Sequence, residues 1–212
     1  MAKDYGEYDF GKPKFISPIP FKPELLTLNG ISPRQIEEHF NVLYIGYVNK
    51  TNEIRKRLMT ASRAEPSSTY SPYRCLKVEE SYAFDGVKFH EYYFENLGGK
   101  YKRPDGLLER AIIDSFGSYQ NWIEDFKVLG LSMRGWAVLS FDYRDGGLHN
   151  YGLDAHNIGV ITGSVPLLVL DVYEHAYFID YGTRRAAYIE AFMENIDWEV
   201  VNRRFYEINF KY

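Results

Sequence analysis

The period of the hydrophobic pattern changes near Trp136, and this change restricts the fold of the 212-residue chain more than any other feature. Before it, apolar residues recur every three or four positions along two long segments, which is the spacing of amphipathic helices. After it come short apolar runs, the first two separated by a glycine-containing turn, which is typical of strands. These runs read WAVLSFDY, LHNYGLD and VPLLVLDV. The chain then returns to the helical period, so the sequence predicts a mixed fold in which long helices precede the strands.

Local signals place the expected elements. Ser32 followed by Pro33 is a helix start, whereas residues 61–73, rich in proline and serine, indicate a loop between two helices that form an antiparallel hairpin. The expected helices of the first two thirds of the chain span 33–59, 77–97, 107–116 and 118–129. We therefore divide the chain into an irregular N-terminal arm at 1–31, an α-hairpin domain at 32–104 and a C-terminal α/β domain at 105–212.

Charge and cysteine content exclude several classes of protein. A net charge of -4 argues against a general binder of nucleic acid or anionic membranes, because such proteins need a basic face. The single cysteine, Cys75, excludes an intrachain disulfide framework and a CxxC metal site, and it is compatible with the cytoplasmic location that we expect. We find no secretion signal and no uninterrupted apolar run of about 18 residues, so no membrane span is expected.

Three histidines and one aspartate are candidate metal ligands: His39, His90, Asp171 and His175. Each has an ordinary structural explanation, since a lone helix histidine is commonly a hydrogen-bonded core or surface residue and Asp171 is placed to cap a helix. Taken together they favour a metal site. An aspartate at the end of an apolar strand is expected to be buried, and a buried carboxylate needs a partner.

At this point the sequence resembles a known family. The stretch PLLVLDVYEHAYFIDY resembles the signature of iron/manganese superoxide dismutases, D-x-W-E-H-A-Y-Y-x-x-Y, with Tyr173 at the usual tryptophan. The resemblance continues, in order, through PIPF, EEHFNVLYIGYVNKTN, FHEYYFENLGG, FGSYQNWIEDF, GWAVLSFD, DAH and NIDWEVVNRRF. It implies an α+β fold with a long N-terminal α-hairpin domain, followed by an α/β domain with a three-stranded antiparallel sheet.

The resemblance also implies a cofactor and the residues that hold it. His39, His90, Asp171 and His175 match the ligands of one iron or manganese ion per subunit, and three imidazoles with one carboxylate suit either metal. Zinc is the alternative ion for such ligands. The sequence does not separate iron from manganese.

Three further residues match positions around the metal. Tyr47 matches a gateway tyrosine that helps to deliver protons, and Trp136 matches an aromatic residue of the pocket lining. His156 matches the hydrogen-bond donor that tunes the metal, a position commonly held by glutamine, while the alternative donor position is Gly86 here. The alternatives are a core or interface tyrosine for Tyr47, a core tryptophan for Trp136 and a solvated loop histidine for His156. We assign His149 to the solvated surface.

The resemblance implies assembly and substrate steering as well. Glu174 matches a residue that pairs with the ligand histidine of the opposite subunit, so a homodimer or tetramer is expected, and Arg185 matches a cation that steers anionic superoxide. Glu174 has a solvated helix-start carboxylate as its ordinary explanation. Leu43 and Phe178 replace a histidine and a tyrosine that usually hydrogen-bond across the dimer contact, and they predict an apolar contact instead.

The expected function is therefore that of a superoxide dismutase, an antioxidant oxidoreductase that converts superoxide to oxygen and hydrogen peroxide. The alternative is a catalytically inert homologue that keeps the fold and the metal, because fold alone does not establish function. A metal hydrolase is a weaker alternative, since no glutamate is placed as a general base beside the ligands.

Overall fold

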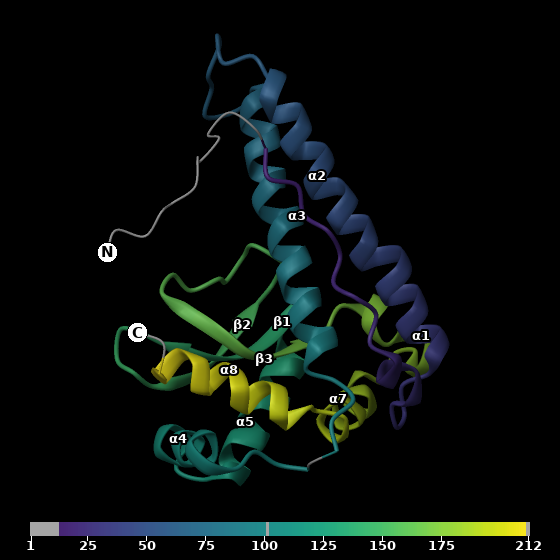
Figure 1. Cartoon of the computed structure of the whole chain (residues 1–212), viewed down its shortest axis with the longest axis vertical. Helices are drawn as coiled ribbons and strands as arrows, with labels where there is room; N and C mark the ends of the chain where they lie inside the picture. The colour runs from purple at the N-terminus through teal and green to yellow at the C-terminus, as the bar shows by residue number, and fades with distance from the viewer. Residues whose placement is uncertain (1–12, 101, 211–212) are drawn as a thin grey trace, which may run out of the picture.

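The computed structural model describes residues 13–100 and 102–210, and its elements follow one another as helices, a sheet and further helices (Figure 1). The first 12 residues of the predicted arm lie outside the described residues. The hairpin of α2 (Ile45–Thr60) and α3 (Pro72–Glu95) stands beside the sheet in Figure 1, with α4 (Gly106–Phe116) and α5 (Tyr119–Ser132) at the end away from the hairpin tip.

The first predicted helix is present, but its centre is not an ordinary α-helix. It consists of α1 (Pro33–Glu37), the π-helical segment η2 (Glu38–Tyr44) and α2. Ser32 caps the start, because its side chain accepts a hydrogen bond from the Gln35 backbone N–H. At the end of η2 the N–H of Ile45 bonds to the carbonyl of Phe40, five residues back. Such wide turns are frequent at functional sites, and this one contains His39.

The second helix of the hairpin begins earlier than the pattern predicted. Helix α3 starts at Pro72 rather than near Lys77, because Ser71 is its N-cap and accepts a hydrogen bond from the N–H of Arg74. Our assignment of Ser71 and Pro72 to the loop was therefore wrong. They form the same start signal that we identified at Ser32 and Pro33.

The described part of the arm lies along the hairpin (Figure 1). The Asn52 side chain donates to the Ile16 carbonyl and accepts from the Ile16 N–H, at 2.8 and 2.9 Å. The Tyr44 hydroxyl accepts from the N–H of Ile19 at 2.7 Å and donates to Glu91. The arm contains a short 3-10 helix, η1 (Pro23–Thr27). These bonds supply partners for a backbone that has little secondary structure of its own.

The sheet is three-stranded and antiparallel, which confirms the predicted fold class. The order is β2 (Leu148–Leu153), β1 (Trp136–Asp142), β3 (Ser164–Asp171), with β1 central and buried throughout. A register shift between β1 and β3 lies beside Pro166, which has no N–H to donate and is tolerated on an edge strand. The register pairs Trp136 with Asp171, so the start of β1 and the end of β3 meet.

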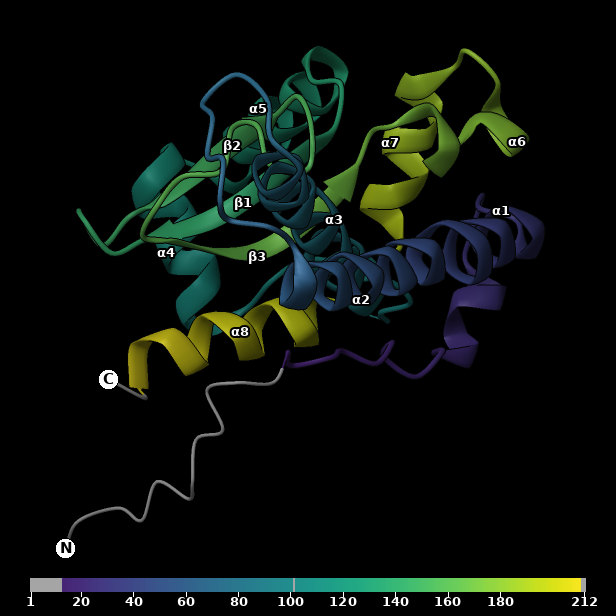
Figure 2. The same cartoon turned by 90° about the horizontal axis from the view of Figure 1, so that it is seen from above.

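Helices cover the sheet and complete the core. Helix α5 packs against β1 and β2, and both α3 and α8 (Trp198–Phe210) pack against β3. Beyond β3 the chain forms η3 (Glu174–Ala176), α6 (Phe178–Tyr181) and α7 (Arg185–Glu194). Helix α6 lies against α1 at one end of the molecule (Figure 2). Within residues 13–100 and 102–210, no helix combines the length and the apolar character that a membrane crossing requires.

Candidate metal centre

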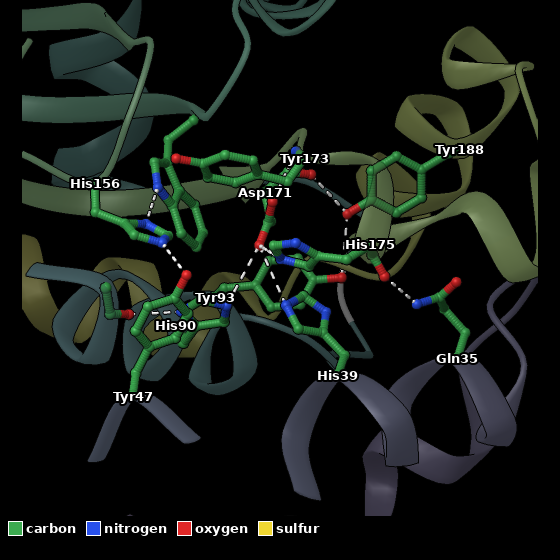
Figure 3. Close-up of polar contacts among 12 residues, drawn as sticks. Gln35, His39, Tyr47, His90, Tyr93, His156, Asp171, Tyr173, His175 and Tyr188 are labelled. Carbon is green, nitrogen blue, oxygen red and sulfur yellow. Dashed lines mark hydrogen bonds and ion pairs between the residues drawn. The ribbon is translucent and has the colours of Figure 1, made fainter. Parts of the chain in front are cut away.

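Four side chains from four different elements converge at the end of β3 (Figure 3). His39 comes from η2, His90 from α3, Asp171 is the last residue of β3, and His175 lies in η3. Each offers one ligand atom, and these atoms lie within 4.8 Å of one another. The first three side chains are fully buried and His175 is 26% exposed. The structure therefore brings together all four residues predicted as ligands.

The chemistry of this cluster fits a metal ion. The Asp171 Oδ2 atom lies 3.2 Å from the Nε2 atoms of His39 and His175, and 3.7 Å from that of His90. Yet the Nε2 atoms of His39 and His90 have no hydrogen-bond partner among the described residues. Buried nitrogens without partners are rare in folded proteins, and here they face a carboxylate. Three nitrogens and one oxygen suit iron or manganese.

The protonation states are also those that a metal requires. Burial lowers the pKa of His39 and His90, so that both imidazoles are neutral. The His90 Nδ1–H donates to the Gly86 carbonyl at 2.6 Å, which leaves Nε2 as a free lone pair. Burial alone would raise the pKa of Asp171, but the neighbouring imidazoles of His175 and then His39 hold it well below its usual value. The carboxylate is therefore ionised.

Hydrogen bonds to the backbone hold the strand end and η3 in place. The N–H of Tyr173 donates to Asp171 Oδ1 at 2.9 Å, and the Tyr188 hydroxyl donates to the Asp171 carbonyl at 2.9 Å. Buried Gln35 donates to the His175 carbonyl at 2.6 Å and accepts from the N–H of Ile179 (Figure 3). The α1 side of the hairpin thus orients the segment that contains the fourth ligand. Our sequence reasoning missed both Gln35 and Tyr188, because neither belongs to a recognisable motif.

His156 is fully buried, and its two ring nitrogens have different roles. Trp136 Nε1–H donates to its Nδ1 at 3.1 Å, and tryptophan cannot accept a bond there. The proton of the neutral ring is therefore on Nε2, which donates to the Tyr47 hydroxyl at 2.8 Å (Figure 3). Burial lowers the pKa of His156 to about 4, in keeping with the neutral form. The solvated-loop alternative for His156 does not hold, whereas His149 is half-exposed and bonded to Asp145.

Gly86 makes the room that His156 and Tyr47 occupy. A Cβ atom at residue 86 would lie 3.2 Å from His156 Cδ2 and 3.2 Å from Tyr47 Cδ1, which is tighter than ordinary contact. In the sequence, Gly86 occupies the alternative position for the hydrogen-bond donor that tunes the metal, and glycine has no side chain to donate. The structure adds that the absence of a side chain here is what allows the imidazole and the phenol to meet.

Three tyrosines and a tryptophan surround the His156 ring. Ring-centre distances are 4.8 Å to Tyr47, 4.6 Å to Tyr82, 5.1 Å to Tyr173 and 5.7 Å to Trp136. Tyr82 was not identified from the sequence, although it lies on α3 eight residues before His90 and thus on the same side of that helix. That spacing was the signal available.

Arg185 and Glu174 lie outside the ligand cluster. The Arg185 guanidinium donates to the Tyr177 hydroxyl at 3.0 Å and to the Met133 carbonyl at 2.8 Å. Glu174 is exposed, and within the described residues its carboxylate has no hydrogen-bond or ion-pair partner. The steering role of Arg185 and the intersubunit role of Glu174 stay predictions.

A long helical hairpin and an α/β unit that share one buried site of three histidines and one aspartate define a mononuclear metalloprotein. Comparison with known proteins gives the family. A family model described as the C-terminal domain of iron/manganese superoxide dismutases matches residues 104–204. The chain is 46% identical over 189 residues to an iron superoxide dismutase of Aquifex aeolicus (strain VF5), with 87% of each chain covered.

Two more distant relatives extend this result. An iron superoxide dismutase of Cupriavidus metallidurans is 37% identical over 196 residues, which cover 90% of this chain and 95% of the relative. A manganese superoxide dismutase of Halobacterium salinarum is 32% identical over 193 residues, which cover 90% and 94%. The chain belongs to the iron/manganese superoxide dismutase family.

The space at Gly86 generates a stability prediction with a matched control. Gly46→Ala in α2 has no atom within 4 Å of the new Cβ, so it should stabilise the protein by up to about 1 kcal/mol through helix propensity. In Gly86→Ala, crowding against His156 and Tyr47 should cancel this gain. The free energy of unfolding of Gly86→Ala should be at least about 1 kcal/mol lower than that of Gly46→Ala. Urea denaturation measures both, and equal stabilisation by the two variants would contradict the assigned role of Gly86.

Burial of His156 generates a pH prediction. The pKa of His156 is about 4 in the folded protein against 6.5 for the free side chain, so between these values the unfolded chain takes up a proton that the folded chain excludes. The stability that depends on neutral His156 is complete above pH 6.5 and falls as the pH falls towards about 4. His156→Gln removes this titration. Between pH 6.5 and about 4, the free energy of unfolding of the variant should therefore fall by roughly 3 kcal/mol less than that of the wild type. Denaturation at the two ends of the window measures this difference, and parallel pH profiles would show that the folded protein does not hold His156 neutral.

Proposed function

We propose that the protein converts superoxide to oxygen and hydrogen peroxide at one iron or manganese ion held by His39, His90, Asp171 and His175. The observation that carries this proposal is the buried cluster of unpaired imidazole nitrogens facing an ionised carboxylate, in a chain 46% identical to an iron superoxide dismutase. The intact ligand set and this identity favour an enzyme over the inert homologue. When bound, the ion supplies reversible one-electron chemistry.

The protein's own residues have to bring in an anion and supply protons. Two superoxide anions and two protons give one oxygen and one hydrogen peroxide, so each turnover consumes two protons. The groups beside the ligands that carry exchangeable protons include the Tyr47 hydroxyl and His156 Nε2–H, which are hydrogen-bonded to each other. Burial, and after it the neighbouring Tyr82 phenol, raises the pKa of Tyr47, so this phenol keeps its proton until a base is beside it.

The direction of the hydrogen bonds gives His156 a particular role. Because Trp136 occupies Nδ1, the ring has a single N–H to offer, and Tyr47 accepts it. The Tyr47 proton therefore points away from His156 and is available to the reacting anion. His156 holds the phenol in this orientation, and Trp136 holds His156 in the required tautomer.

We assign substrate steering to Arg185. The chain carries a net charge of -4, so attraction of an anion has to come from a local cation. The bonds of Arg185 to Tyr177 and Met133 hold its charge near the segment that contains His175, since Tyr177 lies two residues beyond this ligand. Steering of this kind weakens as salt is added.

We propose that two copies associate through the surface beside the site, as a homodimer or as part of a tetramer. Large apolar side chains are exposed there: Val42 at 57%, Phe178 at 49% and Ile179 at 45%. Contact between Leu43 of one copy and Phe178 of the other would bury such surface. Glu174, which has no partner among the described residues, lies next to His175, whose side chain is partly exposed, so it is available to the ligand of a second copy.

The division of the chain into an arm, a hairpin and a C-terminal unit also stands as a proposal. The family match at 104–204 supports a boundary near residue 104. We further propose a cytoplasmic location, on the ground that Cys75 is a free thiol in a chain with no second cysteine to pair with it.

Removal of a ligand tests the activity. After separate loading with iron and with manganese, the wild-type protein should consume superoxide with at least one metal, and His175→Ala should lower turnover by at least about 100-fold. His149→Ala is the matched control, because His149 lies on the surface of β2 and should leave turnover unchanged. Circular dichroism confirms that each variant is folded. Stoichiometric metal without turnover in the wild type would establish the inert homologue instead.

A charge in the apolar surface tests association. Phe178→Glu should weaken self-association by at least about tenfold, because it places a carboxylate in an apolar contact. Val128→Glu is the control, since Val128 is 61% exposed on α5, away from α6. Sedimentation velocity over a range of concentrations measures the mass of each species. Equal dissociation of both variants, or a monomeric wild type, would contradict the proposed surface.

A further inference from the structure

We propose that Asn96 is a positioning residue for the metal site. Its side chain fixes helix α3, which contains His90, against strand β3, which ends at Asp171. This inference rests on the proposed function, because it concerns the same ligands. Asn96 is the C-cap residue of α3, six residues after His90, and it is fully buried. It is not one of the four candidate ligands, so any role that it has must act through them.

The outer edge of β3 has no neighbouring strand among the described residues. The backbone groups of alternate residues therefore face away from the sheet and need other partners. Side chains from three helices supply them. Arg204 of α8 donates to the Leu167 carbonyl at 2.8 Å. Tyr188 of α7 donates to the Asp171 carbonyl at 2.9 Å. Asn96, from the end of α3, occupies the position between these two.

Asn96 bonds to Val169 as a neighbouring strand would. Its Oδ1 atom accepts from the Val169 N–H at 2.9 Å, and its Nδ2 atom donates to the Val169 carbonyl at 3.3 Å. The Nδ2 atom also donates to the carbonyl of Tyr93, in the last turn of α3, at 3.1 Å. The amide is thus held by its own helix and by the strand at once. Because Val169 lies two residues before Asp171, these bonds fix the position of α3 along β3.

This position matters because one ligand comes from the helix and another from the strand. The Nε2 atom of His90 lies 3.7 Å from the Oδ2 atom of Asp171. Moving a strand by one residue displaces it by about 3.3 Å, whereas a functional cluster tolerates errors of only about 0.5 Å. Apolar packing of α3 on the sheet, such as Phe89 stacked on Trp136, is non-directional and resists separation better than sliding. The directional bonds of Asn96 resist sliding.

Asn195 provides a matched control within the same chain. It is also a buried asparagine at the C-cap of a helix, here α7. Its Nδ2 atom donates to the carbonyls of Asn29 and Ala191, both at 2.7 Å, and its Oδ1 atom accepts from the Asn29 N–H at 2.9 Å. Both asparagines therefore make the same three bonds. Asn195 joins α7 to the turn before α1, and neither of these segments contains a candidate ligand.

The affinity of the full-length protein for Mn²⁺ tests the inference without relying on turnover. Mn²⁺ is added to the metal-free protein in competition with a chelator. Asn96→Ala should raise the dissociation constant by at least about tenfold, as when a residue that orients metal ligands is removed, and Asn195→Ala should leave it within about twofold. Circular dichroism shows that each metal-free variant is folded at the temperature used. Equal dissociation constants for the two variants would overturn the proposal.

The visible spectrum of the Co²⁺-loaded protein is a readout that a merely structural role would not move. Absorption by Co²⁺ depends on the arrangement of its ligands. The spectrum should change in Asn96→Ala and stay that of the wild type in Asn195→Ala. If Asn96 contributes to stability alone, both variants should lower the Tm and keep the wild-type spectrum. That result would contradict the assigned role.

A second pair of variants decides the question if Asn96→Ala does not fold. Asn96→Gln keeps the amide but places it one methylene group further from the backbone, so its bonds to Val169 require α3 to move. It should weaken Mn²⁺ binding and change the Co²⁺ spectrum, whereas Asn195→Gln should do neither. Wild-type affinity and spectrum in Asn96→Gln would overturn the proposal.

Failure of this inference is distinguishable from failure of the proposed function. If the wild type binds metal in a way that depends on Asn96 but does not consume superoxide, the inference stands and the proposed function is wrong. If the wild type consumes superoxide and Asn96→Ala binds Mn²⁺ as tightly as Asn195→Ala, the function stands and the inference is wrong. A wild type that binds no metal would overturn both.

Discussion

The carboxylate of Asp171 is the group on which the rest of the structure depends. It is fully buried at the end of an apolar strand, where an ionised group is destabilising unless it is paired. Tyr173 and His175, just beyond the strand, bond to it, whereas His39 and His90 face it from the hairpin, so the full cluster forms only when the hairpin is packed against the sheet. The metal site and the contact between the two halves of the chain are therefore one physical requirement. Loss of the site would also weaken the tertiary structure that creates it.

Groups that can only donate or only accept then fix the direction of the hydrogen bonds. The Gly86 carbonyl takes the Nδ1 proton of His90, and the Trp136 N–H occupies Nδ1 of His156. One imidazole is left with a bare nitrogen for a metal and the other with an N–H for Tyr47. A single neighbour thus decides which ring nitrogen carries the proton in each histidine, and the two side chains have different roles as a result. Residues that are not themselves candidate ligands, such as Gly86 and Trp136, therefore contribute to the proposed function through the imidazoles that they orient.

Much of the fold was predictable because its signals are local. The change of period at Trp136 predicted the strands to within a residue or two, and Ser32 with Pro33 marked the first helix. The same type of signal at Ser71 and Pro72 was missed because the surrounding stretch is rich in loop-forming residues. The four ligands were identified from their residue types and the family resemblance, and the structure places their ligand atoms within 4.8 Å of one another.

By itself, the sequence determined the order of helices and strands and the family to which the chain belongs, and it predicted four metal ligands, since each depends on residue type and spacing. Only the tertiary structure decided the tautomer of His156, the space beside Gly86 and the place of Tyr82 in the group around the imidazole. These features depend on distances between α2, α3 and the loop after β2, which are far apart in the chain. No local pattern encodes such distances, because they are set by how the hairpin packs on the sheet.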